Sequence, residues 1–162
     1  MMLILMGVSG SGKTTVGRLL ASQLNRPFLD ADDFHSPENI RKMSQGVPLT
    51  DADRHPWLMA MNQRLRELEK KGTSAVLACS ALKETYRQIL ISEIKDACFI
   101  HLHADFETIH KWLRERSGHF MPSSLLQSQF ETLEEPAHAL KINASQPPEA
   151  IVATICRHFA LQ

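Results

Sequence analysis

The residues with the clearest chemical purpose lie near the amino terminus, in the stretch Gly7-Val8-Ser9-Gly10-Ser11-Gly12-Lys13-Thr14. This stretch fits G-x-x-x-x-G-K-[ST] at every fixed position, a pattern typical of loops that hold the phosphates of a nucleoside triphosphate. Glycines let the backbone curl so that successive N–H groups point at phosphate oxygens, and a following helix adds the positive end of its dipole. We therefore expect nucleotide contacts from Gly7, Val8, Ser9, Gly10, Ser11, Gly12, Lys13, Thr14 and Thr15.

Two side chains of this loop have more specific expected roles. Lys13 reaches the β- and γ-phosphates as a point charge, and the Thr14 hydroxyl ligates Mg²⁺. The surrounding sequence supports this reading, because an apolar run (residues 2–6) precedes the loop and apolar residues at helical spacing follow it in residues 15–24. Strand, glycine loop and helix is the setting that the motif requires.

Acidic residues follow the next predicted strand, Phe28 to Asp30, in the run Asp30-Ala31-Asp32-Asp33. Phosphoryl transfer uses one carboxylate to hold hydrated Mg²⁺ and often a second to position the acceptor hydroxyl. Alternate residues of an extended segment face the same way, so Asp30 and Asp32 are expected to face the site and Asp33 to face away. The third strand ends at Cys79-Ser80 without an acid, and a catalytic role for Cys79 is the less favoured alternative.

Two cations stand out among the many in the chain. Lys83 opens the helix after the third strand, and Arg54 begins the helix after the acidic loop 50–53, in which Asp51 or Asp53 is the expected cap. Converging there, they suit a small anionic substrate that carries hydroxyl groups. The stretch 114–120 lies between two predicted helices and contains a glycine, so we expect a lid that brings arginine onto the transferring phosphoryl group.

The elements that must position these residues alternate along the chain. Strands are predicted at 2–6, 28–30, 74–78, 97–103 and 139–143, with helices at 15–24, 36–44, 54–71, 83–94, 105–116, 124–133 and 148–160. This alternation predicts one α/β domain over residues 1–162, with a parallel sheet covered on both faces. Ligands of such sheets bind beyond the carboxyl ends of the strands, which singles out Gly7 onward, Asp30 and Asp32, residues 79–83, residues 104–105 and Asn143 onward.

Composition excludes several classes of function. The 162 residues carry a formal net charge of zero, so no global field recruits nucleic acid or an anionic membrane. The longest apolar run, residues 1–6, is too short to span a bilayer. Three cysteines without C-x-x-C spacing indicate reduced thiols in a cytoplasmic protein. His101 and His103 are predicted to be structural, and Met43, Met59 and Met61 to fill the core.

Several motifs together resemble the gluconate kinases (gluconokinases), small P-loop kinases related to shikimate and adenylate kinases. The resemblance covers residues 5–136. It rests on the phosphate loop, on Asp30-Ala31-Asp32-Asp33-Phe34-His35, on the segment from Pro48 to Leu58 with its D-R-x-P-W-L pattern, on Cys79-Ser80-Ala81-Leu82-Lys83 with Tyr86-Arg87, on Arg116 with His119-Phe120, and on the segment from Gln129 to Glu134 with Pro136.

This resemblance implies a P-loop NTPase fold of three layers (α/β/α) with a five-stranded parallel sheet, a helical substrate-binding segment at about 34–72 and a lid at about 114–136. It also implies a homodimer that uses ATP and Mg²⁺ to phosphorylate D-gluconate at the 6-hydroxyl. By the same analogy Asp32 orients that hydroxyl and Asp30 the magnesium waters. The candidates for holding the acid are His35, Arg54, Lys83 and His119.

The chain departs from the family pattern in two places. Trp112 stands where relatives often have arginine, which leaves Arg116, helped by Arg114, as the cation facing the phosphoryl group. The segment after Pro136 is shorter than usual, so adenine contacts around residues 143–147 stay unassigned. Two alternatives remain open: a kinase for another small acceptor such as shikimate or a nucleoside monophosphate, and a nucleotide-dependent switch. The lack of an N-K-x-D signature disfavours a GTPase.

Overall fold

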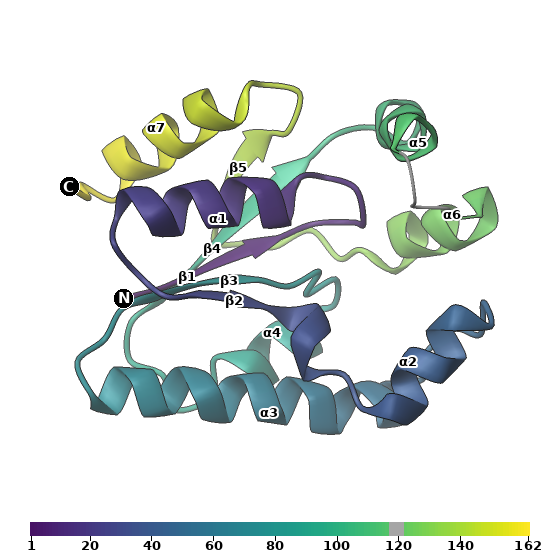
Figure 1. Cartoon of the computed structure of the whole chain (residues 1–162), viewed down its shortest axis with the longest axis horizontal. Coiled ribbons are helices and arrows are strands. Elements are labelled where there is room, and N and C mark those ends of the chain that lie inside the picture. Colours follow the sequence, from purple (N-terminus) through teal and green to yellow (C-terminus); the bar gives the residue numbers. More distant parts are fainter. Residues whose placement is uncertain (117–121) are drawn as a thin grey trace.

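A parallel sheet forms the centre of the computed structural model, which describes residues 1–116 and 122–162 (Figure 1). Its five strands run in the order β2-β3-β1-β4-β5. They are β1 (Met2–Met6), β2 (Phe28–Asp30), β3 (Ala75–Ala78), β4 (Ala97–His103) and β5 (Ala139–Asn143). Every strand pair is parallel, which confirms the predicted α/β class.

Helices cover both faces of this sheet (Figure 1). Helices α1 (Lys13–Gln23) and α7 (Pro148–His158) lie on one face, and α3 (Asp51–Lys70) and α4 (Glu84–Leu90) lie on the other. The remaining helices, α2 (Pro37–Ser44), α5 (Phe106–Glu115) and α6 (Ser123–Thr132), lie beyond the carboxyl ends of the strands. Those three helices therefore surround the edge of the sheet at which β1 leads into the phosphate loop and β2 leads into Asp32.

The core explains why the strands are so apolar. Strand β1 is buried at all five positions, since it lies at the centre of the sheet with helices on both sides. One cluster of buried residues joins the sheet to α3, and a second joins it to α1 and α7. A third, smaller cluster lies at the phosphate loop and contains Val8, Leu82, Ile109, Leu113 and Leu126. The loop thus has its own apolar support.

Local details differ from the sequence-based expectations at three points. Helix α3 is capped by Thr50 rather than by Asp51 or Asp53: the Thr50 hydroxyl accepts from the Asp53 N–H, and the Asp53 carboxylate accepts from the Thr50 N–H. Helix α4 ends at Leu90, four residues early. Met43 and Met59 are 42% and 47% exposed, so their assignment to the core was wrong; Met61 is buried.

Within the described residues no helix combines the length and the apolar character that crossing a bilayer requires.

Candidate active site

The phosphate loop follows β1 and bends so tightly that two of its glycines are required. Gly7 has φ 145°, and a Cβ there would lie 2.5 Å from the carbonyl oxygen of Leu102 on β4. Gly10 has φ 81°, and its Cβ would lie 2.8 Å from the Leu113 side chain on α5. Both positions combine a backbone conformation that L side chains rarely adopt with no room for a side chain. The loop is therefore closely packed against β4 and α5.

The amide groups of this loop divide into two sets. The N–H groups of Gly7, Ser9 and Ser11 donate to Ser80 O, Gln129 Oε1 and Val8 O. Those of Val8, Gly10, Gly12, Lys13 and Thr14 have no hydrogen-bond acceptor among residues 1–116 and 122–162. The second set includes the first turn of α1, where unpaired N–H groups and the helix dipole favour an anion. The loop fits a triphosphate.

Lys13 is folded back onto the loop, and its ammonium donates to the Val8 carbonyl oxygen at 2.9 Å. The pKa of Lys13 is lowered to about 8, mainly because burial removes the ammonium from water; the charge of Arg116 contributes in the same direction. The nearby carboxylates of Asp30 and Asp32 act in the opposite direction. Arg116 and both acids therefore lie within electrostatic reach of Lys13.

Asp30 and Thr14 form the part of the site suited to a metal. The Thr14 hydroxyl donates to Asp30 Oδ2 at 3.2 Å, which joins the start of α1 to the end of β2. A hydroxyl and a carboxylate are the hard oxygen ligands that Mg²⁺ takes beside substrate phosphates. In the described parts of the chain no group of three or more His, Cys, Asp or Glu side chains could hold a metal ion alone. The residues present fit a magnesium ion shared with a nucleotide.

Asp32 reaches this edge by a route that the sequence did not indicate. Residues 31–34 form a 3-10 turn rather than an extended segment, and the Asp32 N–H donates to Asp30 Oδ1 at 3.0 Å. The argument from alternating residues was therefore wrong about the backbone, although Asp30 and Asp32 do lie close together. The protein around Asp32 raises the pKa of its carboxyl, and the negative charge of Asp30 raises it further.

His35 is held by two residues whose roles the sequence did not reveal. Its ring stacks on Trp57 with centroids 4.3 Å apart and planes 10° apart, and its Nδ1 lies 3.4 Å from Asn39 Nδ2. The indole N–H of Trp57 donates to the Ala31 carbonyl oxygen at 2.7 Å. Trp57 therefore positions both the turn that carries Asp32 and the ring of His35. The hydrophobic pattern of α3 predicted only that Trp57 is buried.

The two predicted cations meet at Asp51. Lys83 Nζ lies 3.5 Å and Arg54 Nη1 4.0 Å from Asp51 Oδ1, and the Tyr86 hydroxyl donates to the same oxygen. Arg54 Nη1 also donates to Leu49 O at 2.6 Å and lies 3.3 Å from the Tyr86 hydroxyl. The hydrogen bond from Tyr86 lowers the pKa of Asp51, so this acid stays ionised between the cations. Sequence reasoning missed Asp51 and Tyr86 as members of the site.

The remaining candidates have different outcomes. Arg116 follows the last residue of α5 and is exposed, within electrostatic reach of Lys13. His119 and the glycine of the expected lid lie outside the described residues. Cys79 is buried, and burial raises the pKa of its thiol to about 12, so it is no nucleophile. His101 is also buried, in keeping with a structural role.

Comparison with known proteins identifies the family. The family model of shikimate kinase matches residues 9–159. The chain is 44% identical over 160 residues to the gluconokinase of Gluconobacter oxydans, covering 97% of this chain and 90% of that protein. It is 50% identical over 133 residues to the thermosensitive gluconokinase of Escherichia coli, covering 82% and 71%. The crystal structure of a gluconokinase from Sinorhizobium meliloti superposes with a TM-score of 0.85 at 41% identity, covering 98% and 94%.

The chain belongs to the gluconokinases of the shikimate kinase family. A shikimate kinase from Aquifex aeolicus shares the fold at a TM-score of 0.62 and 20% identity. The resemblance seen in the sequence motifs is thereby confirmed.

A recess that no sequence motif marked lies beside the phosphate loop. It is a hollow of about 260 Å³ on the side of the phosphate loop away from Asp32, between the loop, α5 and the start of α7. Its lining consists of Gly10, Ser11, Gly12, Thr15, Val16, Trp112, Ala144, Ser145, Gln146, Pro148 and Ile151. The aromatic ring of Trp112 is the largest planar surface in this lining. Two features of the sequence pointed to this place: tryptophan instead of the usual arginine at position 112, and the region around residues 143–147, where adenine contacts were left unassigned.

Proposed function

We propose that the protein transfers the γ-phosphoryl group of ATP to the 6-hydroxyl of D-gluconate, giving 6-phospho-D-gluconate and ADP. One observation supports the proposal above all: three features lie together at the carboxyl ends of the strands. They are the phosphate loop with Lys13, the carboxyl of Asp32 with its raised pKa, and the cations around Asp51. The gluconokinases among its relatives supply the identity of the acceptor.

The reaction begins with binding of the triphosphate by the amides of Gly10, Gly12, Lys13 and Thr14. Lys13 exchanges its contact with the Val8 carbonyl for the β- and γ-phosphate oxygens, a move that requires only rotation of its side chain. The gluconate hydroxyl oxygen then attacks the γ-phosphorus in line as the bond to the β-phosphate oxygen breaks. Its proton passes to Asp32, whose raised pKa suits a proton acceptor. Arg116 stabilises the charge on the transferring group.

Thr14 and Asp30 are the residues proposed to hold magnesium, directly or through its waters. When bound, the ion neutralises charge on the β- and γ-phosphates. The 3.2 Å hydrogen bond between the two side chains already holds their oxygens side by side. Little reorganisation is therefore needed to form the metal site.

The acid end of the substrate is proposed to bind His35, Arg54, Lys83 and His119. Asp51 and Tyr86 hold Arg54 and Lys83 in place before substrate arrives. Because one carboxylate offsets only one of the two cations, the cluster keeps a net positive charge that suits a monoanion. Stacking on Trp57 fixes His35 beside this cluster and beside Asp32.

An acceptor panel tests the proposed reaction. ADP release is measured with gluconate, shikimate and AMP at matched concentrations, and only gluconate is expected to give rapid turnover. Preference for shikimate or AMP assigns another kinase activity. ATP hydrolysis that ignores every acceptor assigns a nucleotide-dependent switch.

The protein is further proposed to work as a cytoplasmic homodimer without nucleic-acid or membrane partners. The three free thiols, of which Cys79 and Cys156 are buried, support the cytoplasmic location. The homodimer is proposed from the family resemblance alone. Light scattering should give twice the chain mass, and cell fractionation should place the activity in the cytoplasmic fraction.

The pH dependence of kcat/KM for MgATP should report on Lys13. Its pKa of about 8 means that the side chain is charged below that pH and loses its charge above it. We expect kcat/KM to be nearly constant from pH 6 to 7 and to fall at higher pH with an apparent pKa near 8. Lys13→Arg is the control, since arginine stays charged and its residual activity should lack this decline. A wild-type profile that is flat to pH 9.5 contradicts the assignment.

Trp112 is proposed to stack on the adenine of ATP in the hollow beside the phosphate loop. Base–aromatic stacking contributes ~1–3 kcal/mol, so Trp112→Ala should raise KM for ATP about tenfold while kcat changes little. Steady-state kinetics at saturating gluconate measure both constants. Lys111→Ala, an exposed neighbour on α5, is the matched control. An unchanged KM in Trp112→Ala would show that the base binds elsewhere.

A further inference from the structure

The phosphate loop is held by a side chain from the opposite end of the sequence. The carboxamide of Gln129 on α6 contacts both polar groups of Ser9. Its Oε1 accepts from the Ser9 N–H at 2.7 Å, and its Nε2 donates to Ser9 Oγ at 2.9 Å. The orientation of the carboxamide is unambiguous, since a backbone N–H only donates and must face the oxygen. Residues 120 positions apart thus form a two-point contact.

Helix α6 is itself fixed against the same loop. Leu126, three residues before Gln129, is fully buried in the cluster that also contains Val8. Residues three apart lie on one face of a helix, so this face of α6 contacts Val8 and Ser9, two successive residues of the loop. Beyond the helix end, the Glu134 N–H donates to Leu82 O at 2.8 Å, and Arg87 donates to the Glu134 carbonyl oxygen at 3.0 Å.

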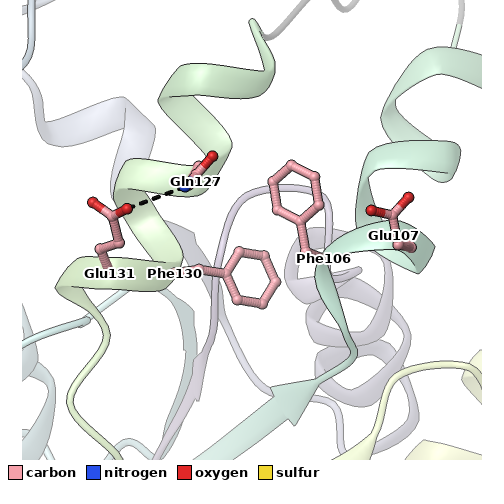
Figure 2. A pocket seen from close by; sticks show the side chains of 5 residues that line it. All are labelled: Phe106, Glu107, Gln127, Phe130 and Glu131. Atoms are coloured by element: carbon pink, nitrogen blue, oxygen red, sulfur yellow. Dashed lines mark hydrogen bonds between the residues drawn. The ribbon is translucent and has the colours of Figure 1, made fainter.

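The neighbouring helix supports the next loop residue. Leu113 and Ile109 of α5 pack directly against Gly10. Helices α5 and α6 also contact each other, with the rings of Phe106 and Phe130 edge to face at 5.8 Å (Figure 2). Residues 8–10 of the loop are therefore packed against two helices, α5 and α6, which also contact each other.

The Ser9 N–H is used by a protein contact. It donates to Gln129, while the N–H groups of Val8 and Gly10 on either side of it have no acceptor among the described residues. We propose that Gln129 is a positioning residue: by holding both polar groups of Ser9, it keeps the loop in the curvature that presents the amides of Gly10, Gly12, Lys13 and Thr14 to phosphate. This inference rests on the proposed use of ATP but not on the identity of the acceptor.

The test measures MgADP binding by titration calorimetry, which needs no acceptor. The variants are Gln129→Met, Ser9→Ala, their double mutant, and Gln127→Met. The last makes the same substitution on the same helix, at an exposed residue whose side chain donates a hydrogen bond to Glu131 (Figure 2). Because each hydrogen bond contributes modestly, we expect Gln129→Met to weaken MgADP about tenfold and Ser9→Ala about threefold. Gln127→Met should bind within about twofold of wild type.

The double mutant separates a direct contact from independent effects. If Gln129 acts through Ser9, the double mutant should resemble Gln129→Met, about tenfold weaker, rather than about thirtyfold weaker as independent effects would give. In steady-state kinetics KM for MgATP should rise while KM for gluconate stays unchanged. If Gln129 only stabilised the fold, Gln129→Met would lower the melting temperature and the fraction of active protein, and the two KM values would not change differently.

Three results overturn the proposal: MgADP affinity of Gln129→Met within twofold of wild type, losses that multiply in the double mutant, or both KM values rising together. If Gln129→Met fails to fold, the MgADP affinity of Ser9→Ala is the test, and wild-type affinity in that variant overturns the proposal. Wild-type protein that binds no MgADP would instead contradict the proposed function.

Discussion

Asp32→Asn should lower kcat by about three orders of magnitude while KM for MgATP changes little. Asparagine keeps the size of the side chain and the backbone N–H that donates to Asp30, but it cannot accept the proton of the attacking hydroxyl. Among the described residues the Asp32 side chain has no recorded hydrogen bond, so the fold should be unaffected. A discontinuous assay of 6-phosphogluconate formation at saturating concentrations of both substrates gives kcat directly.

Asp33→Asn is the matched control for this change. Asp33 occupies the same 3-10 turn, is exposed, and has no assigned role. Its kcat should stay within about twofold of wild type, as expected of a surface substitution away from the site. Near-normal turnover in Asp32→Asn would exclude Asp32 as proton acceptor, and equal losses in both variants would point to the turn as a whole.

Lys13→Met should give the second large loss, on the order of 10³-fold in kcat, because it removes a charge aimed at the transferring group in a partly dry site. Its effect on stability should have the opposite sign. A lysine pKa lowered to about 8 means that folding disfavours the charged form at every pH below that value. At pH 7 the nucleotide-free variant should therefore melt at the same temperature as wild type or higher.

Thermal melting with and without MgATP checks both parts of this prediction. Wild type should gain stability when the nucleotide is added, whereas Lys13→Met should gain little. Lys42→Met is the control, because Lys42 pairs with Asp53 on the acceptor side and lies outside the phosphate loop. A Lys13→Met protein that melts well below wild type would show that the contact of Lys13 with Val8 stabilises the fold more than the buried charge weakens it.

Much of this site was predictable because it depends on short sequence motifs. The phosphate loop, Asp30, Asp32 and Arg54 follow from local patterns whose physical meaning is fixed by backbone geometry. The strands β2, β4 and β5 matched their predicted bounds, since apolar runs between helices leave little choice in a parallel sheet.

The residues that were missed act across the sequence. Trp57 holds Ala31, Tyr86 holds Asp51, and Gln129 holds Ser9; each contact spans 26 residues or more. No periodicity reveals such pairs, because a buried tryptophan or a helical glutamine gives the same local signal whatever its partner is. The turn at Asp32 was misread for a related reason: the carboxylate of Asp30 caps the Asp32 N–H and favours a tight turn over extension.

The strand order has a consequence for how selectivity evolves. Because β1 is central, two groups of described residues come from opposite halves of the sheet and from separate stretches of chain. The residues proposed to hold the acceptor lie between positions 30 and 87, and the far wall of the hollow beside Trp112 is formed by positions 112 and 144–151. Mutations that retune acceptor choice thus leave the nucleotide half untouched. Proteins with this architecture can therefore change their acceptor alcohol by single substitutions and keep the same phosphoryl donor at each step.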